Sequence, residues 1–153
     1  MAVVHHSGIV VRDLDTSLRF WRDGIGLAVL MDEHFDGDWP TLFDVSSTRL
    51  RAVFLGDPAR PDAGVVELVG VDGATPAAAP PPVHPRPAGF LLLSVLTDVD
   101  ATLTRLDDLG LGGEPRRVSA HGVAMAVVRD PDGVLVELVH DTARANLDRL
   151  MGG

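Results

Sequence analysis

Cysteine is absent from the 153 residues of the chain. Disulfide bonds and thiolate metal sites are therefore excluded, and any metal ion must be held by histidine, aspartate or glutamate. Basic residues are few, 13 against 22 acidic ones, and the net charge is −9. Because nucleic acids and anionic membrane surfaces repel such a chain, we expect neither as a partner.

Long apolar runs are also lacking. The longest fall far short of the roughly 20 residues that a membrane span needs. The first residues, MAVVHH, read as a strand and contain no basic region followed by an apolar signal segment. Apolar residues still make up 46% of the chain, enough for a globular core. These features predict a soluble, cytoplasmic protein.

What the chain does contain is an internal repeat. The segment 13–18, DLDTSL, matches the segment 98–103, DVDATL, at an offset of 85 residues. The motif Val-Glu-Leu-Val occurs at 66–69 and again at 136–139, an offset of 70, and each copy follows an Asp-Pro turn. Two matched landmarks in the same order indicate two copies of one module.

Each half is predicted to run strand, helix, strand, strand, strand. Apolar residues at helical spacing follow Asp13 and Asp98, which are N-cap candidates. The predicted strands are residues 3–11, 27–31, 49–55 and 64–71, and then 89–96, 115–118, 122–128 and 134–140.

Proline divides the two halves. Residues 72–88 hold six of the eleven prolines, which cannot join a sheet interior, and we interpret this segment as a linker. We predict a first module at 1–71, the linker at 72–88, a second module at 89–141 and a terminal helix or tail at 142–153.

Glu67 and Glu137 stand in otherwise apolar strands, and neither has an obviously hydrated face to point into. A buried carboxylate must be protonated, paired or bound to a metal. An ion pair with Arg49 or Arg51 is one interpretation. The equivalent repeat positions of the two glutamates favour a shared, pseudo-symmetric site instead.

His6 lies on the first strand. Taken alone, it reads as a hydrogen-bonded or edge residue, but beside two carboxylates it becomes a candidate ligand. Neutral imidazole and carboxylate oxygens suit Fe(II), Mn(II), Ni(II) or Zn(II).

The segment 6–15, HSGIVVRDLD, followed by Phe20-Trp21-Arg22, resembles the opening motif of the vicinal oxygen chelate superfamily of glyoxalases, bleomycin-resistance proteins and extradiol dioxygenases. The segment from Arg129 to Glu137, with Asp130-Pro131-Asp132-Gly133, resembles its closing motif. The similarity covers nearly the whole chain. The motifs are specific for the superfamily and say almost nothing about the substrate.

The resemblance implies an α+β fold of two βαβββ modules whose mixed, curved sheets form a cup-shaped site around a divalent ion, here Fe, Mn, Ni, Zn or Co. The family's ligand positions carry over to His6, Glu67 and Glu137. A fourth ligand is expected on the first strand of the second module, where the 85-residue offset places Leu91. Leucine cannot bind a metal. Either His121 or His84 fills the gap, or the site binds no metal, as in drug-sequestering members.

Other candidates are weaker. His121, at a rim position, is a candidate substrate contact. Arg51 could bind an anionic substrate or pair with Glu67. Trp39 could form a lid over the cup or a hydrophobic plug, and we favour the plug.

The leading hypothesis is an enzyme that binds a small carbonyl or hydroxy substrate through its oxygens and stabilises the enolate formed on proton removal. Glu67 or Glu137 would act as the base, in glyoxalase, epimerase or lyase chemistry. The alternative is a metal-free protein that sequesters a small molecule. One histidine and two carboxylates are not the ligand set of the superfamily's oxygenases, so ring-cleaving dioxygenase chemistry is disfavoured. We expect a homodimer, and the modules could pair within one chain or swap between two.

Overall fold

The computed structural model describes residues 1–120 and 122–143 and divides the chain into two compact units, Met1–Ala78 and Ala79–Gly153. The boundary lies inside the proline-rich segment 72–88. No helix or strand occurs between residues 71 and 93, all of which are described. None of the helices in the described ranges is long and apolar enough to cross a membrane.

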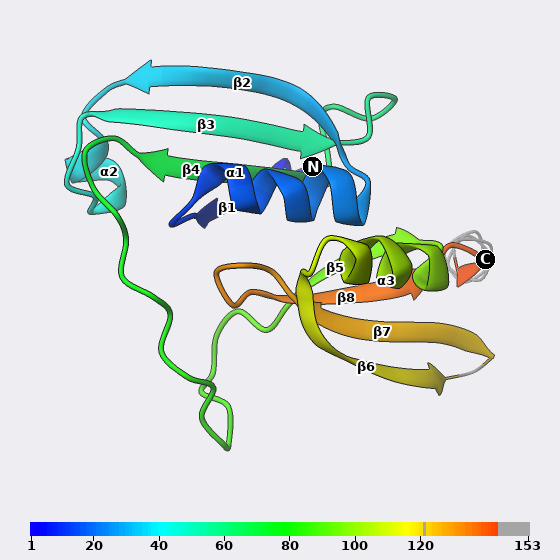
Figure 1. The fold of residues 1–153 in the computed structure, drawn as a ribbon. Coiled ribbons are helices and arrows are strands. Elements are labelled where there is room, and N and C mark those ends of the chain that lie inside the picture. The colour runs from blue at the N-terminus through cyan, green and yellow to red at the C-terminus, as the bar shows by residue number, and fades with distance from the viewer. Residues whose placement is uncertain (121, 144–153) are drawn as a thin grey trace. The chain divides into compact units, whose positions relative to one another are not determined.

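The first unit is a four-stranded sheet with the order β1-β4-β3-β2. Strand β1 runs parallel to β4, and the other neighbours are antiparallel. Figure 1 shows the first helical segment lying along one face of this sheet. The elements are β1 (His6–Val10), α1 (Leu14–Leu18), the π-helix η1 (Arg19–Ile25), β2 (Ala28–Asp36), α2 (Trp39–Phe43), β3 (Arg49–Gly56) and β4 (Val65–Val71).

The second unit repeats this plan with the strand order β5-β8-β7-β6. Strand β5 runs parallel to β8, and β6, β7 and β8 are antiparallel neighbours. The elements are β5 (Leu93–Thr97), α3 (Val99–Asp108), β6 (Gly112–Ala120), β7 (Val123–Arg129) and β8 (Leu135–His140). The predicted α+β fold of two βαβββ modules is confirmed, and the short helix α2 is an addition peculiar to the first module.

In each module an aspartate at the same repeat position caps the start of the first helix. The carboxylate of Asp13 accepts a hydrogen bond from the backbone N–H of Thr16 at 3.1 Å, and Asp98 accepts one from Ala101 at 3.0 Å. Each aspartate thus satisfies one of the free N–H groups at a helix start. The first helical segment ends at Gly26, whose φ of 98° lies in the left-handed region that favours glycine.

Strand alternation places the core on the helix side of each sheet. Leu68 and Leu138 are 0% exposed, and they share their face with the buried Val66 and Val136. The other face of β4 and β8 is only partly covered. The expectation that neither glutamate has a hydrated face was therefore wrong, because the helices bury only one side of each sheet.

Several strand limits differ from the predicted ones. Residues 32–48 were expected to be irregular, but β2 continues to Asp36 because it pairs with β3 as far as Arg49. Strand β6 extends over Gly112–Ala120, well beyond the predicted 115–118, through its pairing with β7. Strand β1 begins at His6 rather than residue 3, because its pairing with β4 begins there.

Candidate functional site

The strand register brings His6 and Glu67 together on the sheet face away from the helix. Gly8 is the direct neighbour of Glu67 on the adjacent parallel strand, and His6 lies two residues before it on the same face. A Cβ at residue 8 would lie 3.5 Å from Oε2 of Glu67, so glycine leaves the carboxylate room. The His6 Nε2 atom is 3.3 Å from this Oε2.

The imidazole of His6 is held from two other sides. Its Nδ1 lies 2.8 Å from Nδ1 of His5, which requires one of the two rings to donate and the other to accept. Its ring meets Phe54 edge to face at 5.6 Å between centroids. Phe54 is in turn the β3 neighbour of Glu67. These contacts aim Nε2 of His6 at the carboxylate.

Glu67 is a partly buried acid. Its side chain is 19% exposed, against 42% for His6. Burial raises the pKa of Glu67 because it disfavours the charged form, and the nearby His6 imidazole opposes that shift. The carboxylate can therefore hold a proton more tightly than an exposed glutamate does.

The alternative ion pairs of Glu67 were wrong. Arg51 forms a two-pronged ion pair with Asp32, at 2.9 and 2.7 Å. Arg49 bonds Asp36 and lies 3.4 Å from Asp72. The physical reason is the register: odd-numbered residues of β3 point to the helix side of the sheet, whereas Glu67 points to the other side with Phe54.

Glu137 occupies the corresponding place in the second unit. It pairs with Ser94 of β5 and Val127 of β7, as Glu67 pairs with Gly8 and Phe54. It lines a pocket of about 180 Å³ together with Arg116 and Arg117.

The register also locates the counterpart of His6. Two residues before Ser94 stands Leu92, so the structural equivalent of His6 is Leu92 rather than Leu91. The offset of 85 residues between the helices becomes 86 between the first strands, from Gly8 to Ser94. The conclusion is unchanged, because neither leucine can bind a metal.

The His6–Glu67 pair has the spacing of two ligands on one ion. Zinc–ligand bonds are about 2.0–2.2 Å, and bond angles of 90–110° then separate two ligand atoms by roughly 3.0–3.5 Å. The observed 3.3 Å falls in this range. Within residues 1–120 and 122–143, however, no group of three His, Asp or Glu side chains is close enough to hold a metal. The first unit alone therefore contains two side chains of a type that can bind a metal.

Arg51 and Trp39 lie away from this pair. Arg51 is engaged with Asp32 on the opposite face of the sheet. Trp39 starts α2, donates a hydrogen bond from Nε1 to the carbonyl of Phe35 at 2.9 Å, and stacks on Phe43 at 5.5 Å. These contacts tie Trp39 to its own loop. Whether it acts as a plug or a lid stays a prediction.

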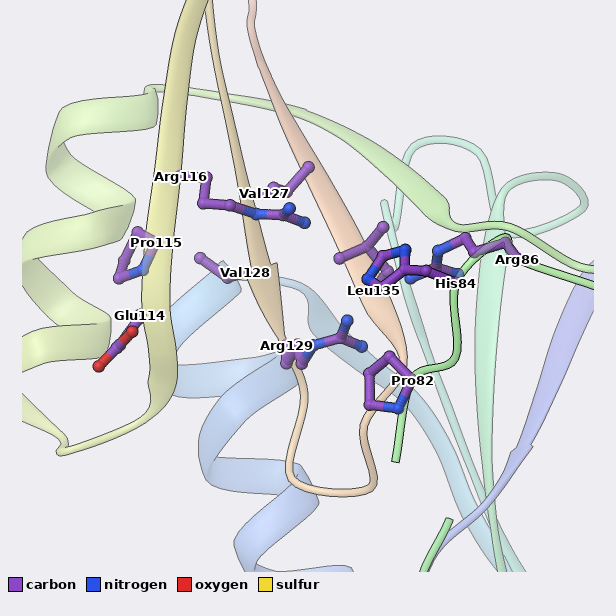
Figure 2. Close-up of a pocket in the computed structure, with 10 residues that line it drawn as sticks. All are labelled: Pro82, His84, Arg86, Glu114, Pro115, Arg116, Val127, Val128, Arg129 and Leu135. Atoms are coloured by element: carbon purple, nitrogen blue, oxygen red, sulfur yellow. The ribbon is translucent and has the colours of Figure 1, made fainter. Parts of the chain in front are cut away.

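Of the two histidines proposed to complete the ligand set, the structure places only His84. His121 lies outside the described residues. His84 lines a pocket of the second unit together with Arg86, Arg116 and Arg129 (Figure 2). Guanidinium groups repel a metal ion, so this setting does not favour His84 as a ligand. None of these arginines is predicted to be functional from the sequence, because Arg86 and Arg116 lie in no motif and Arg129 only begins the closing motif.

Comparison with known proteins agrees with this architecture. A family model described as Glyoxalase/Bleomycin resistance protein/Dioxygenase superfamily matches residues 3–138. The lactoylglutathione lyase-like protein terB of Aspergillus terreus is 37% identical over 145 residues, which cover 89% of this chain and 74% of that protein.

Solved structures show the same fold. A glyoxalase family protein from Bacillus cereus superposes with a TM-score of 0.71 at 19% identity, over 92% of this chain and 94% of that one. The trypanothione-dependent glyoxalase I of Leishmania major gives a TM-score of 0.67 at 22% identity and covers 100% of both chains.

Proposed function

Because the chain belongs to the glyoxalase, bleomycin resistance protein and dioxygenase superfamily, we propose that it is a glyoxalase-type lyase or isomerase. Its substrate would be a small molecule with a carbonyl group beside a hydroxyl or second carbonyl. Glu67 would remove a proton from the carbon next to the carbonyl. The lyase-like name of the Aspergillus relative is consistent with this class of reaction.

The observation that carries the proposal is the His6–Glu67 pair. Burial raises the pKa of Glu67, so its carboxylate is a stronger base than an exposed glutamate. The carboxylate points to the sheet face that the helices leave partly open, where a substrate can approach. His6 is fixed beside it by His5 and Phe54, and among the described residues no arginine forms an ion pair with Glu67.

A divalent metal ion fits this pair. His6 Nε2 and Glu67 Oε2 would be two of its ligands, and we propose Glu137 of the second module as the third. Glu67 would have to leave the ion before its carboxylate could act as the base. Iron, manganese, nickel, zinc and cobalt all accept imidazole and carboxylate. When bound, the ion would polarise the substrate oxygens and stabilise the negative charge formed on proton removal. We further propose that the site works in a homodimer in the cytoplasm.

The test uses the full-length protein supplied with each metal in turn. Formation of S-lactoylglutathione from methylglyoxal and glutathione is followed, and Glu67→Gln should lower kcat roughly 10²- to 10⁴-fold, the usual contribution of a general base. Glu33→Gln, an exposed glutamate on β2 of the same sheet, is the matched control and should retain activity. Full activity of Glu67→Gln would refute its role as base.

Metal content gives a second, independent readout. Elemental analysis should find about one divalent ion per site, and Glu137→Ala or His6→Ala should lose it. Sedimentation velocity measured in parallel would reveal a homodimer or refute it.

One observation favours a different function. Leu92 occupies the structural position of His6 in the second module, which leaves the ligand set one histidine short. A protein without metal could instead sequester a small molecule in the way the superfamily's drug-binding members do. Metal-free protein that still binds a ligand, with Glu137→Ala unchanged, would support this alternative over the enzyme.

A further inference from the structure

The second unit contains a pocket of about 550 Å³ that the proposed metal ligands His6, Glu67 and Glu137 do not line. This volume is in the range of small-molecule binding sites. It lies on the face of the second sheet that α3 leaves uncovered, at the end where β7 turns into β8, and residues of the linker close its outer side (Figure 2).

Arginine dominates the charge of this pocket. Arg116 comes from β6, Arg129 from the end of β7 and Arg86 from the linker. Figure 2 shows Arg116 and Arg129 extending across the sheet toward the linker, whereas the carboxylate of Glu114 points to the other side of β6. Positive charge is thus collected in one place, in a chain whose net charge is −9.

These three arginines lack acidic partners in the part of the chain that the structure describes. Arg129 donates only to a carbonyl oxygen, that of Gly133, at 2.8 Å. Elsewhere in the described ranges an aspartate lies at ion-pair distance from several arginines, among them Arg22, Arg49, Arg51, Arg60 and Arg117. With 22 acidic residues in the chain, this cluster of uncompensated guanidinium groups stands out.

Apart from His84 and Glu114, the rest of the lining is apolar. Pro82, Pro115, Val127, Val128 and Leu135 provide it, and Val128 and Leu135 are buried. Guanidinium groups match the geometry of carboxylate and phosphate oxygens and bind them with two parallel hydrogen bonds. An apolar wall beside them suits a ligand with a hydrocarbon body.

We propose that this pocket is a binding site for a small organic anion, with Arg86 and Arg116 binding its acidic group and the valine, leucine and proline side chains covering its apolar part. The inference goes beyond the proposed proton abstraction and does not rest on it. Arg116 and Val127 also line the smaller pocket of Glu137, so a bound anion would lie next to that glutamate.

The test is calorimetric titration of the full-length protein with 3-phenylpropionate, its uncharged amide 3-phenylpropionamide, and inorganic phosphate. The carboxylate should bind, and the amide should bind roughly 10- to 100-fold more weakly, since each hydrogen bond to a charged group contributes that much. Phosphate should bind more weakly than the carboxylate, because it makes no use of the apolar wall.

Arg116→Gln and Arg86→Gln should each weaken binding of 3-phenylpropionate by about 10-fold or more. Arg60→Gln is the control: Arg60 is an exposed arginine of the first unit, 3.9 Å from Asp57, and its loss should change nothing. Unchanged urea unfolding would show that the variants are folded. Equal binding of acid and amide, phosphate binding as tight as the carboxylate, or equal weakening by Arg60→Gln would each overturn the proposal. Because no turnover is measured, its failure would leave the role of Glu67 untouched.

Discussion

Replacing Asp130 by alanine should lower the free energy of unfolding by about 3 kcal/mol, because its carboxylate organises the turn between β7 and β8. Oδ1 of Asp130 accepts hydrogen bonds from the backbone N–H groups of Asp132 at 3.0 Å and Val134 at 2.8 Å. The residue is only 5% exposed. The same turn fixes the register that places Glu137 beside Val127.

The magnitude follows from two hydrogen bonds to a charged acceptor, each worth about 1.5–3 kcal/mol. We take the lower end of this range for each bond, since the freed N–H of the partly exposed Asp132 can be hydrated in the variant. Asp130→Asn keeps an oxygen at the same position and should cost only about 1 kcal/mol.

The repeat offers a matched control. Asp57 opens the corresponding Asp-Pro turn of the first module, and its carboxylate accepts a hydrogen bond from the backbone N–H of Ala59 at 2.9 Å. Its side chain is 54% exposed, so Asp57→Ala should cost at most about 1 kcal/mol. Urea unfolding of the full-length proteins at neutral pH measures all three variants. An Asp57→Ala loss as large as that of Asp130→Ala would refute the reasoning from burial.

Three further predictions concern the site and the core. Burial raises the pKa of Glu67, so the folded protein holds this proton more tightly than the unfolded chain; the resulting stabilisation is present below the ordinary value of 4.5 and is lost as the pH rises through the raised value. The permanently neutral Glu67→Gln should therefore gain stability relative to wild type as the pH rises above 4.5 in urea unfolding, and a difference that does not change with pH would contradict this. Leu68→Ala and Leu138→Ala, at 0% exposed positions, should each cost about 2–5 kcal/mol, whereas Leu42→Ala, at 65% exposure, should cost under about 0.5 kcal/mol; thermal unfolding distinguishes them. Arg51→Ala should leave KM unchanged and cost about 1 kcal/mol at most, because its pair with Asp32, with side chains 34% and 37% exposed, lies on the face opposite Glu67. A several-fold rise in KM would restore Arg51 as a substrate contact.

The parts of the fold that could be predicted from the sequence are those that depend on residues close together in the chain. A helix start depends on a cap a few residues away, and Asp13 and Asp98 both carry out that role. The two strands that carry Val-Glu-Leu-Val have the same burial pattern over six residues, from Val65 to Gly70 and from Leu135 to His140. By contrast, the acidic end of β2 has no strand signature, and it is a strand because Arg49 and Arg51 on β3 pair with its aspartates.

The sequence by itself determined the duplicated module, its helix starts and the equivalence of Glu67 and Glu137, because these depend on residues close together in the chain. Only the tertiary structure decided that His6 faces Glu67 at 3.3 Å, since the contact depends on the parallel pairing of strands some sixty residues apart. It also decided that Arg49 and Arg51 point to the other side of the sheet. The arginine pocket arises in the same way: Arg86, Arg116 and Arg129 share no motif, and only the folding of the linker beside β6 and β7 brings their charges together.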